Sequence, residues 1–203
     1  MMFVFISGAA RSGKSTWAEK YALSLSHAEQ MDTPRVYLAT ARILDQEMKE
    51  RVLRHQATRQ EKGFETWEQD VDISRILPRL VQCVPAATLL LECLGTLLAN
   101  EMFGRETTIK TRKTRKTIAS RGREKANVLV EKIYGEILSL KANTANLLVV
   151  SNDVFMDGST YDEETENYRR ALGALHVKLA RESQLAVECV CGQATTIYRK
   201  TPA

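Results

Sequence analysis

A glycine-rich segment near the start of the chain has the residue types and spacing of a phosphate-binding loop. Residues 8–15 have the sequence Gly-Ala-Ala-Arg-Ser-Gly-Lys-Ser, which matches G-x-x-x-x-G-K-[ST]. Backbone N–H groups in such a loop, and at the start of the helix after it, converge on phosphate oxygens. Lys14 adds a full charge near the β- and γ-phosphates, and the Ser15 hydroxyl is a ligand for Mg²⁺. The segment predicts nucleotide binding by Gly8, Ala9, Ala10, Arg11, Ser12, Gly13, Lys14, Ser15 and Thr16.

A magnesium ion at this loop needs a second oxygen ligand, and Glu92 is the candidate. It ends the apolar run Leu89–Leu91, and ligands of open parallel sheets gather at the carboxyl ends of the strands. We therefore predict that Ser15 and Glu92 bind the metal. The alternative is that the Glu92 carboxylate caps the helix that follows.

His55 is the histidine whose surroundings suggest chemistry. It lies among Arg51, Arg54 and Arg59, shortly after the second predicted strand. Neighbouring guanidinium groups disfavour protonation of an imidazole, which leaves a ring nitrogen able to attack phosphorus. Many surface helices also carry a histidine near arginines without any role. His176, within a long predicted helix, is expected to be a buried or rim histidine.

Short apolar runs alternate with longer amphipathic segments along the chain, and these elements must position the candidate residues. Strands are predicted at 3–7, 36–40, 88–93, 146–151 and 186–191, with a possible sixth at 195–199. Helices are predicted at 14–25, from Asp45 onward, and at 73–83, 94–102, 124–140 and 161–183. Continuous apolar strands separated by helices indicate a mainly parallel sheet covered by helices on both faces. The predicted fold class is therefore α/β and P-loop NTPase-like, with residues 1–203 in a single nucleotide-binding domain.

Composition excludes several classes of protein and isolates one unusual segment. Of the 203 residues, 44% are hydrophobic and 27% charged, which is typical of globular chains and not of disordered or fibrous ones. The net charge is +4, but residues 105–125 contain nine Lys or Arg and two Glu, so the positive charge is local. This basic inserted segment, at about 104–125, is interpreted as a solvated loop or charged helix start. The alternatives are a lid over substrate and, less favoured because no aromatic residue is interleaved, a nucleic-acid-binding segment.

Other features of the sequence concern the cellular compartment. No apolar stretch is long enough to cross a bilayer, and the apolar start of the chain lacks a basic leader, so a cytoplasmic protein is expected. Cys83, Cys93, Cys189 and Cys191 show no metal-binding spacing and are predicted to be reduced thiols in the core.

The order and spacing of several motifs resemble those of the bifunctional adenosylcobinamide kinase / adenosylcobinamide-phosphate guanylyltransferases. The resemblance is carried by 10–15, 37–40, 45–55, Arg59, 66–68, 91–94, Asn100, 150–154, 168–169 and Gly173. It implies Mg²⁺ as the cofactor and ATP and GTP as substrates. It also implies a homo-oligomer, as in trimeric family members. The acceptors it implies are adenosylcobinamide and its phosphate.

The resemblance also implies two reactions and the residues for them. The first transfers the γ-phosphoryl group of ATP or GTP to adenosylcobinamide, with Lys14 stabilising the transferred charge. In the second, His55 attacks the α-phosphorus of GTP, and the guanylylated histidine passes GMP to adenosylcobinamide phosphate, which gives adenosylcobinamide-GDP. The residues implied around the guanine nucleotide are Thr40, Ala41, Arg42, the neighbourhood from Arg54 to Arg59, Glu68 and Glu92.

Several positions depart from the family pattern, and they keep two other functions open. These positions are Ala9, Phe64, Asp153, Phe155 and His176. One alternative is a kinase-only relative that lacks the second activity. The other is a nucleotide-dependent switch or binding protein whose basic segment contacts an anionic polymer.

Overall fold

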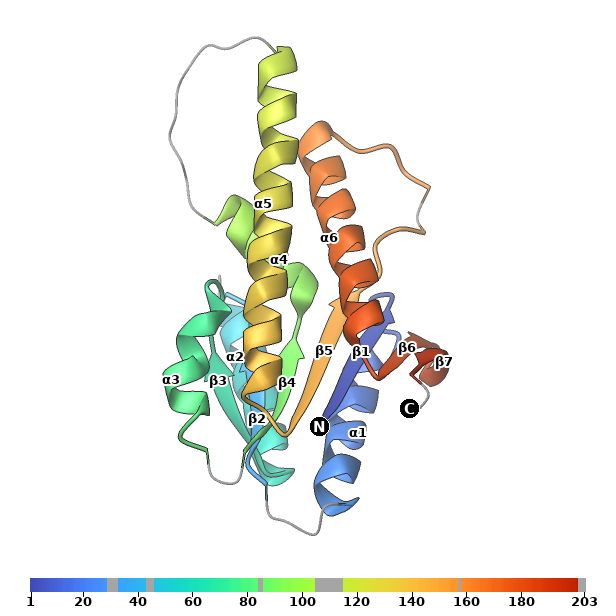
Figure 1. Ribbon diagram of the computed structural model, residues 1–203. Helices are drawn as coiled ribbons and strands as arrows, with labels where there is room; N and C mark the ends of the chain where they lie inside the picture. The colour runs from blue at the N-terminus through green and yellow to red at the C-terminus, as the bar shows by residue number, and fades with distance from the viewer. Residues whose placement is uncertain (29–32, 43–45, 84–85, 105–114, 157, 201–203) are drawn as a thin grey trace.

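A seven-stranded sheet forms the centre of the molecule, with strand order β3-β2-β4-β5-β1-β6-β7 (Figure 1). The computed structural model describes residues 1–28, 33–42, 46–83, 86–104, 115–156 and 158–200. Its strands are β1 (Met2–Gly8), β2 (Arg35–Ala39), β3 (Phe64–Glu68), β4 (Thr88–Glu92), β5 (Asn146–Asn152), β6 (Leu185–Val190) and β7 (Gln193–Arg199). The strands β1 to β6 pair in parallel, and β7 alone pairs antiparallel, with β6. The prediction of a mainly parallel sheet is confirmed.

Helices cover both faces of this sheet, as predicted. They are α1 (Lys14–Ala28), α2 (Gln46–Glu61), the 3₁₀ helix η1 (Ile73–Ile76), α3 (Leu77–Leu80), α4 (Leu94–Phe103), α5 (Arg115–Ala142) and α6 (Glu163–Glu182). One core cluster joins η1, α3, α4, α5 and α6 to the strands through residues such as Phe3, Leu89 and Leu147. A second joins α1 to the opposite face through Val4 and Leu148. Successive strand residues alternate between the two clusters because side chains alternate across a sheet.

The structure differs from the predicted elements mainly at β3 and α5. The strand β3 was not predicted, because its buried residues Phe64 and Trp67 are three positions apart and show no period of two. The helix α5 begins at Arg115 rather than at Glu124, so residues 115–123 of the basic segment are helical. Figure 1 shows the N-terminal turns of α5 extending beyond the sheet. Residues 105–114 of the basic segment, and Asp45, lie outside the described residues.

The prediction that all four cysteines are core thiols was wrong for Cys191. Cys93 and Cys189 are buried, and Cys83 is partly buried. Cys191 is exposed in the turn between β6 and β7, where its φ is 49°. The expected strand ends one residue earlier because the chain reverses there. Among the described helices, none has the length and apolarity needed to cross a membrane.

Candidate active site

The loop between β1 and α1 is a compact turn whose backbone is held by its own residues. The Ser12 N–H donates to the Ala9 carbonyl at 3.2 Å, and Lys14 Nζ donates to the same oxygen at 3.3 Å. Arg11 and Gly13 have φ values of 61° and 88°. These left-handed residues turn the chain so that α1 starts directly at the loop, which directs its unpaired N–H groups toward one place. The predicted phosphate-binding segment thus has the local shape that anion binding needs.

The turn between β6 and β7 packs against this loop and fixes two glycines of the motif. The Gly192 N–H donates to the Ser12 carbonyl at 2.8 Å. A Cβ on Gly13 would lie 2.9 Å from Gly192 Cα, and one on Gly8 would lie 2.6 Å from the Cys189 carbonyl oxygen. Both positions therefore need glycine for a close approach of two backbones, and Gly13 needs it for its φ as well.

Ser15 and Glu92, the two predicted metal ligands, lie together. Ser15 Oγ donates to Glu92 Oε1 in a short hydrogen bond, and the Tyr37 hydroxyl donates to Glu92 Oε2 at 2.8 Å. Burial, followed by the nearby Glu92 carboxylate, raises the pKa of Tyr37 well above its usual value, so the hydroxyl keeps its proton. The helix-cap alternative for Glu92 was wrong, because the Cys93 side chain caps α4 by accepting from the Thr96 N–H.

The oxygens present fit magnesium better than a softer metal. Mg²⁺ prefers hard oxygen ligands and usually takes one or two from the protein, with phosphate oxygens and water completing its shell. Ser15 and Glu92 supply a hydroxyl and a carboxylate beside the loop. These two residues would hold the ion against a bound triphosphate.

His55 lies on α2, and its side chain is exposed. The link between this helix and the loop runs through Arg59, which is 8% exposed and stacks on the Tyr37 ring at 3.7 Å from its centroid. Arg59 Nε donates to the His55 carbonyl at 3.0 Å. Arg59 thus bonds to the backbone of His55, whereas Arg54 is exposed and donates to the Glu50 carbonyl. A continuous set of contacts runs from Ser15 through Glu92, Tyr37 and Arg59 to the turn of α2 that carries the histidine.

The remaining predicted nucleotide residues lie at the carboxyl ends of β2 and β3. Ala39, the last residue of β2, is in register with Glu68 on one side and Glu92 on the other. Glu68 is exposed and accepts from the Gln56 side chain of α2 at 2.9 Å. Arg42 pairs with Asp70, beside the exposed Ala41.

Thr40 is fully buried, and its polar groups join strands. Its hydroxyl donates to the Cys93 carbonyl at 2.9 Å and accepts from the Cys93 N–H at 2.8 Å. Its carbonyl accepts from the Asn100 side chain at 2.8 Å. These bonds hold the ends of β2 and β4 next to α4, while contact of Thr40 with a nucleotide stays a prediction.

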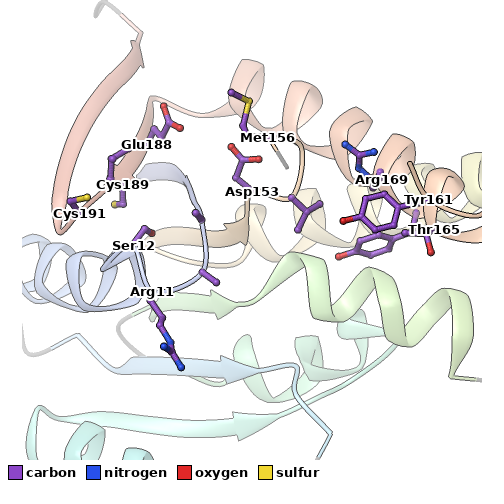
Figure 2. Close-up of a pocket in the computed structure, with 15 residues that line it drawn as sticks. Arg11, Ser12, Asp153, Met156, Tyr161, Thr165, Arg169, Glu188, Cys189 and Cys191 are labelled. Atoms are coloured by element: carbon purple, nitrogen blue, oxygen red, sulfur yellow. The ribbon is translucent and has the colours of Figure 1, made fainter. Parts of the chain in front are cut away.

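A site feature missed by the sequence is a cavity of about 760 Å³ beside the loop. Figure 2 shows the side chains that surround it. Its lining residues are Ala9, Ala10, Arg11, Ser12, Asp153, Val154, Met156, Tyr161, Thr165, Tyr168, Arg169, Glu188, Cys189, Val190 and Cys191. His55 is not among them. The cavity combines the loop, the residues after β5, the start of α6 and the β6–β7 turn, so no single sequence pattern marks it.

His176 supports the residues that lead into this cavity. Its Nε2 is 2.7 Å from Ser151 Oγ, and its ring makes edge contacts with Phe5 and Phe155. Burial lowers the pKa of His176 to about 4, against a smaller opposing effect of Asp153. The imidazole is therefore neutral at pH 7. The prediction of a buried or rim histidine is confirmed.

The loop, the Ser15–Glu92 pair and the parallel sheet together define a P-loop nucleotide-binding protein of the α/β class. A family model described as "Cobinamide kinase / cobinamide phosphate guanyltransferase" matches residues 4–197. The chain belongs to this family, which confirms the resemblance found in the sequence.

Two curated relatives have the same name, "Bifunctional adenosylcobalamin biosynthesis protein CobU". The one from Escherichia coli (strain K12) is 33% identical over 106 residues, which are 50% of this chain and 51% of that protein. The one from Salmonella typhimurium (strain LT2) is 35% identical over 109 residues, again 50% and 51%. The matched part spans about half the length of these relatives.

Solved structures with a similar arrangement are more distant in sequence. A KaiC-like protein from Pyrococcus horikoshii OT3 is 14% identical, with a TM-score of 0.43 over 92% of this chain and 70% of that one. A second solved structure, of an ATPase domain, is 11% identical, with a TM-score of 0.48 over 92% of this chain and 68% of that one.

Proposed function

We propose that the protein phosphorylates adenosylcobinamide with ATP or GTP and then transfers GMP from GTP to the product through a guanylylated His55. Family membership supports both activities. The observation that carries the proposal is the set of contacts from Ser15 through Glu92 and Tyr37 to Arg59, which ties α2 to the phosphate-binding loop.

The first reaction needs charge stabilisation at the transferred group. Lys14 is 7% exposed, so its ammonium acts close to bound phosphates with little screening by water. The loop amides orient the β- and γ-phosphates. Magnesium on Ser15 and Glu92 would neutralise charge on the same oxygens.

The second reaction needs a nucleophile that can reach the α-phosphorus of GTP. A nitrogen of the exposed His55 forms a bond to that phosphorus, and the bond to the oxygen bridging to the β-phosphate breaks, so pyrophosphate leaves. In the next step a phosphate oxygen of adenosylcobinamide phosphate forms a bond to the same phosphorus, and the P–N bond to His55 breaks, which frees the imidazole. Two displacements replace one difficult encounter between two anions.

Arg59 has a feature that supports its predicted contact with the nucleotide. Its Nη1 is buried and has no hydrogen-bond partner among the described residues. A buried donor left unpaired costs about 1–3 kcal/mol. A phosphate oxygen from GTP would satisfy this nitrogen and place the α-phosphorus close to the turn of α2 that carries His55.

Labelling with GTP that carries ³²P at the α-phosphate tests the second reaction. We expect acid-labile, alkali-stable label on the protein, and its loss in His55→Ala. Gln60→Ala, an exposed position on the same helix, is the control and should label normally. Corrinoid-dependent transfer of γ-phosphate should continue in His55→Ala.

The same experiment separates the competing functions. Phosphoryl transfer without any label would leave a kinase-only enzyme. Nucleotide binding without either transfer, together with salt-sensitive retention on DNA or RNA, would favour the switch or binding protein. By family membership we also propose Mg²⁺ as cofactor, a homo-oligomeric assembly such as a trimer, and a cytoplasmic location.

A further inference from the structure

The cavity beside the phosphate-binding loop has walls that differ from those of a polyphosphate site. Two carboxylates, Asp153 and Glu188, line it together with apolar surface from Val154, Met156 and Val190. Carboxylates repel anions. The cavity therefore suits an uncharged or cationic organic molecule better than a chain of phosphates, and its volume is typical of small-molecule sites.

The two arginines at the cavity do not change this preference for an uncharged or cationic molecule. Arg169 forms an ion pair with Glu166 at 2.7 Å, and its guanidinium lies 5.2 Å from the centroid of the Tyr161 ring. Its positive charge is therefore already paired with a carboxylate of α6. Figure 2 shows the Arg11 side chain directed away from Asp153 and Glu188. The two carboxylates line the part of the cavity between α6 and the β6–β7 turn.

Asp153 is held at the edge of the loop by its own backbone and side chain. Its N–H donates to the Gly8 carbonyl at 2.9 Å, which continues the pairing of β5 with β1 into the phosphate-binding segment. Its Oδ1 accepts from the Phe155 N–H at 2.9 Å. A carboxylate has about four acceptor sites, so Asp153 can accept another hydrogen bond from a hydroxyl group in the cavity.

We propose that this cavity binds the hydroxyl-bearing arm of the acceptor and that Asp153 is the general base of phosphoryl transfer. The acceptor oxygen forms a bond to the γ-phosphorus, and the bond from that phosphorus to the oxygen bridging to the β-phosphate breaks. The nucleoside diphosphate leaves with the electron pair, and the hydroxyl proton passes to the Asp153 carboxylate. This inference rests on the proposed kinase activity and adds the acceptor site and its base.

Filling the cavity tests the binding part without any need for turnover. Val190→Trp introduces a large side chain at the cavity wall, and Val177→Trp makes the same change on the outer face of α6; the two valines are 54% and 52% exposed. Equilibrium dialysis with adenosylcobinamide, in the presence of a non-hydrolysable GTP analogue, measures the corrinoid Kd. We expect Val190→Trp to raise it at least tenfold and Val177→Trp to change it less than twofold.

Three results of this dialysis would overturn the acceptor site. They are equal corrinoid binding in both variants, a loss of GTP-analogue binding in Val190→Trp, which would identify a nucleoside pocket, and no corrinoid binding by the wild-type protein. Corrinoid binding that Val190→Trp weakens, without turnover by the wild type, would support the site and contradict the proposed kinase. Turnover by the wild type, with no effect of Val190→Trp on corrinoid binding, would support the proposed kinase and contradict the acceptor site.

Asp153→Asn tests the base. Asn keeps the acceptor oxygen for the Phe155 N–H, so the turn after β5 should be retained, which circular dichroism and thermal unfolding check. We expect kcat for phosphoryl transfer to fall about 10²–10³-fold, while the corrinoid Kd changes less than threefold. Asp153→Glu should recover part of the rate, and Glu163→Gln, an exposed loss of charge on α6, should leave it unchanged. A kcat of Asp153→Asn within threefold of wild type would overturn the role of the base.

Discussion

The phosphate-binding loop and the helix α2 are built in opposite ways. The loop is held by its own hydrogen bonds and by the β6–β7 turn, and Lys14 is buried there, while Ala9, Ala10 and Arg11 are exposed. The predicted nucleophile His55 is exposed on α2, whose tie to the sheet described above depends on the stacking of Arg59 on Tyr37. The shape of the loop is therefore fixed by the fold, whereas the geometry of the histidine depends on a few contacts of one helix.

The contrast follows from where each segment lies in the sheet. The loop follows β1, which has parallel neighbours on both sides, β5 and β6. The helix α2 lies near the edge of the sheet, between β2 and the edge strand β3. Reactions that need only the loop should tolerate changes in α2, and reactions that need His55 should not.

The largest effect is expected from Lys14→Ala. Loss of the buried ammonium should lower both γ-phosphoryl transfer and labelling of His55 by about 10³-fold, because each reaction uses a triphosphate bound at this loop. Steady-state rates and α-phosphate labelling measure the two effects. Lys20→Ala, an exposed position on α1, is the control. Labelling that survives in Lys14→Ala would show that the two reactions do not share one nucleotide-binding site.

Acid should lower the free energy of unfolding of the protein through His176. The folded-state pKa is about 4, below the usual 6.5, so the unfolded chain binds a proton first as the pH falls. Stability is therefore lost between pH 6.5 and about 4, by roughly 3 kcal/mol in total. Urea unfolding at several pH values should show a shallower loss in His176→Gln. His55→Gln, at an exposed site, should keep the wild-type slope, and an equal slope in His176→Gln would contradict the assignment.

The central strands and the Ser15–Glu92 contact could be predicted from the sequence, and most contacts between distant segments could not. The strand runs at Phe3, Leu89 and Leu147 are continuous and apolar because both faces are covered, so they were predicted within one or two residues. The contact of Ser15 with Glu92 followed from the rule that ligands gather at the carboxyl ends of strands.

The missed features depend on contacts between distant segments. The bond from Tyr37 to Glu92 depends on the register of β2 with β4, which no local pattern contains. The cavity needs Asp153 and Val190 to meet the loop, although they come from separate parts of the chain. Local periodicity predicts elements, but it does not predict which side chains a sheet brings together.

Tyr37→Phe tests the point at which the two regions meet. The change removes the hydroxyl donor to Glu92 and keeps the ring on which Arg59 stacks. Since hydrogen bonds to charged groups contribute about 1.5–3 kcal/mol, we expect the free energy of unfolding to fall by about 1.5 kcal/mol. The Mg²⁺ concentration for half-maximal phosphoryl transfer should change several-fold. Tyr21→Phe, whose ring stacks on Trp17, is the control. An unchanged Mg²⁺ dependence would show that the Tyr37 hydroxyl does not position Glu92 for the metal.

Arg59→Lys should give the smallest effect and the sharpest division between the regions. Lysine keeps the charge but loses the flat guanidinium that stacks on Tyr37 and bonds to the His55 carbonyl. Cation–π contacts of this kind contribute about 0.5–2 kcal/mol, so labelling of His55 should slow about fivefold while γ-phosphoryl transfer stays within twofold. Arg181→Lys, exposed in the last turn of α6, should change neither rate. An equal loss in both reactions would mean that Arg59 acts on the phosphates bound at the loop. The helix α2 would then take part in both reactions.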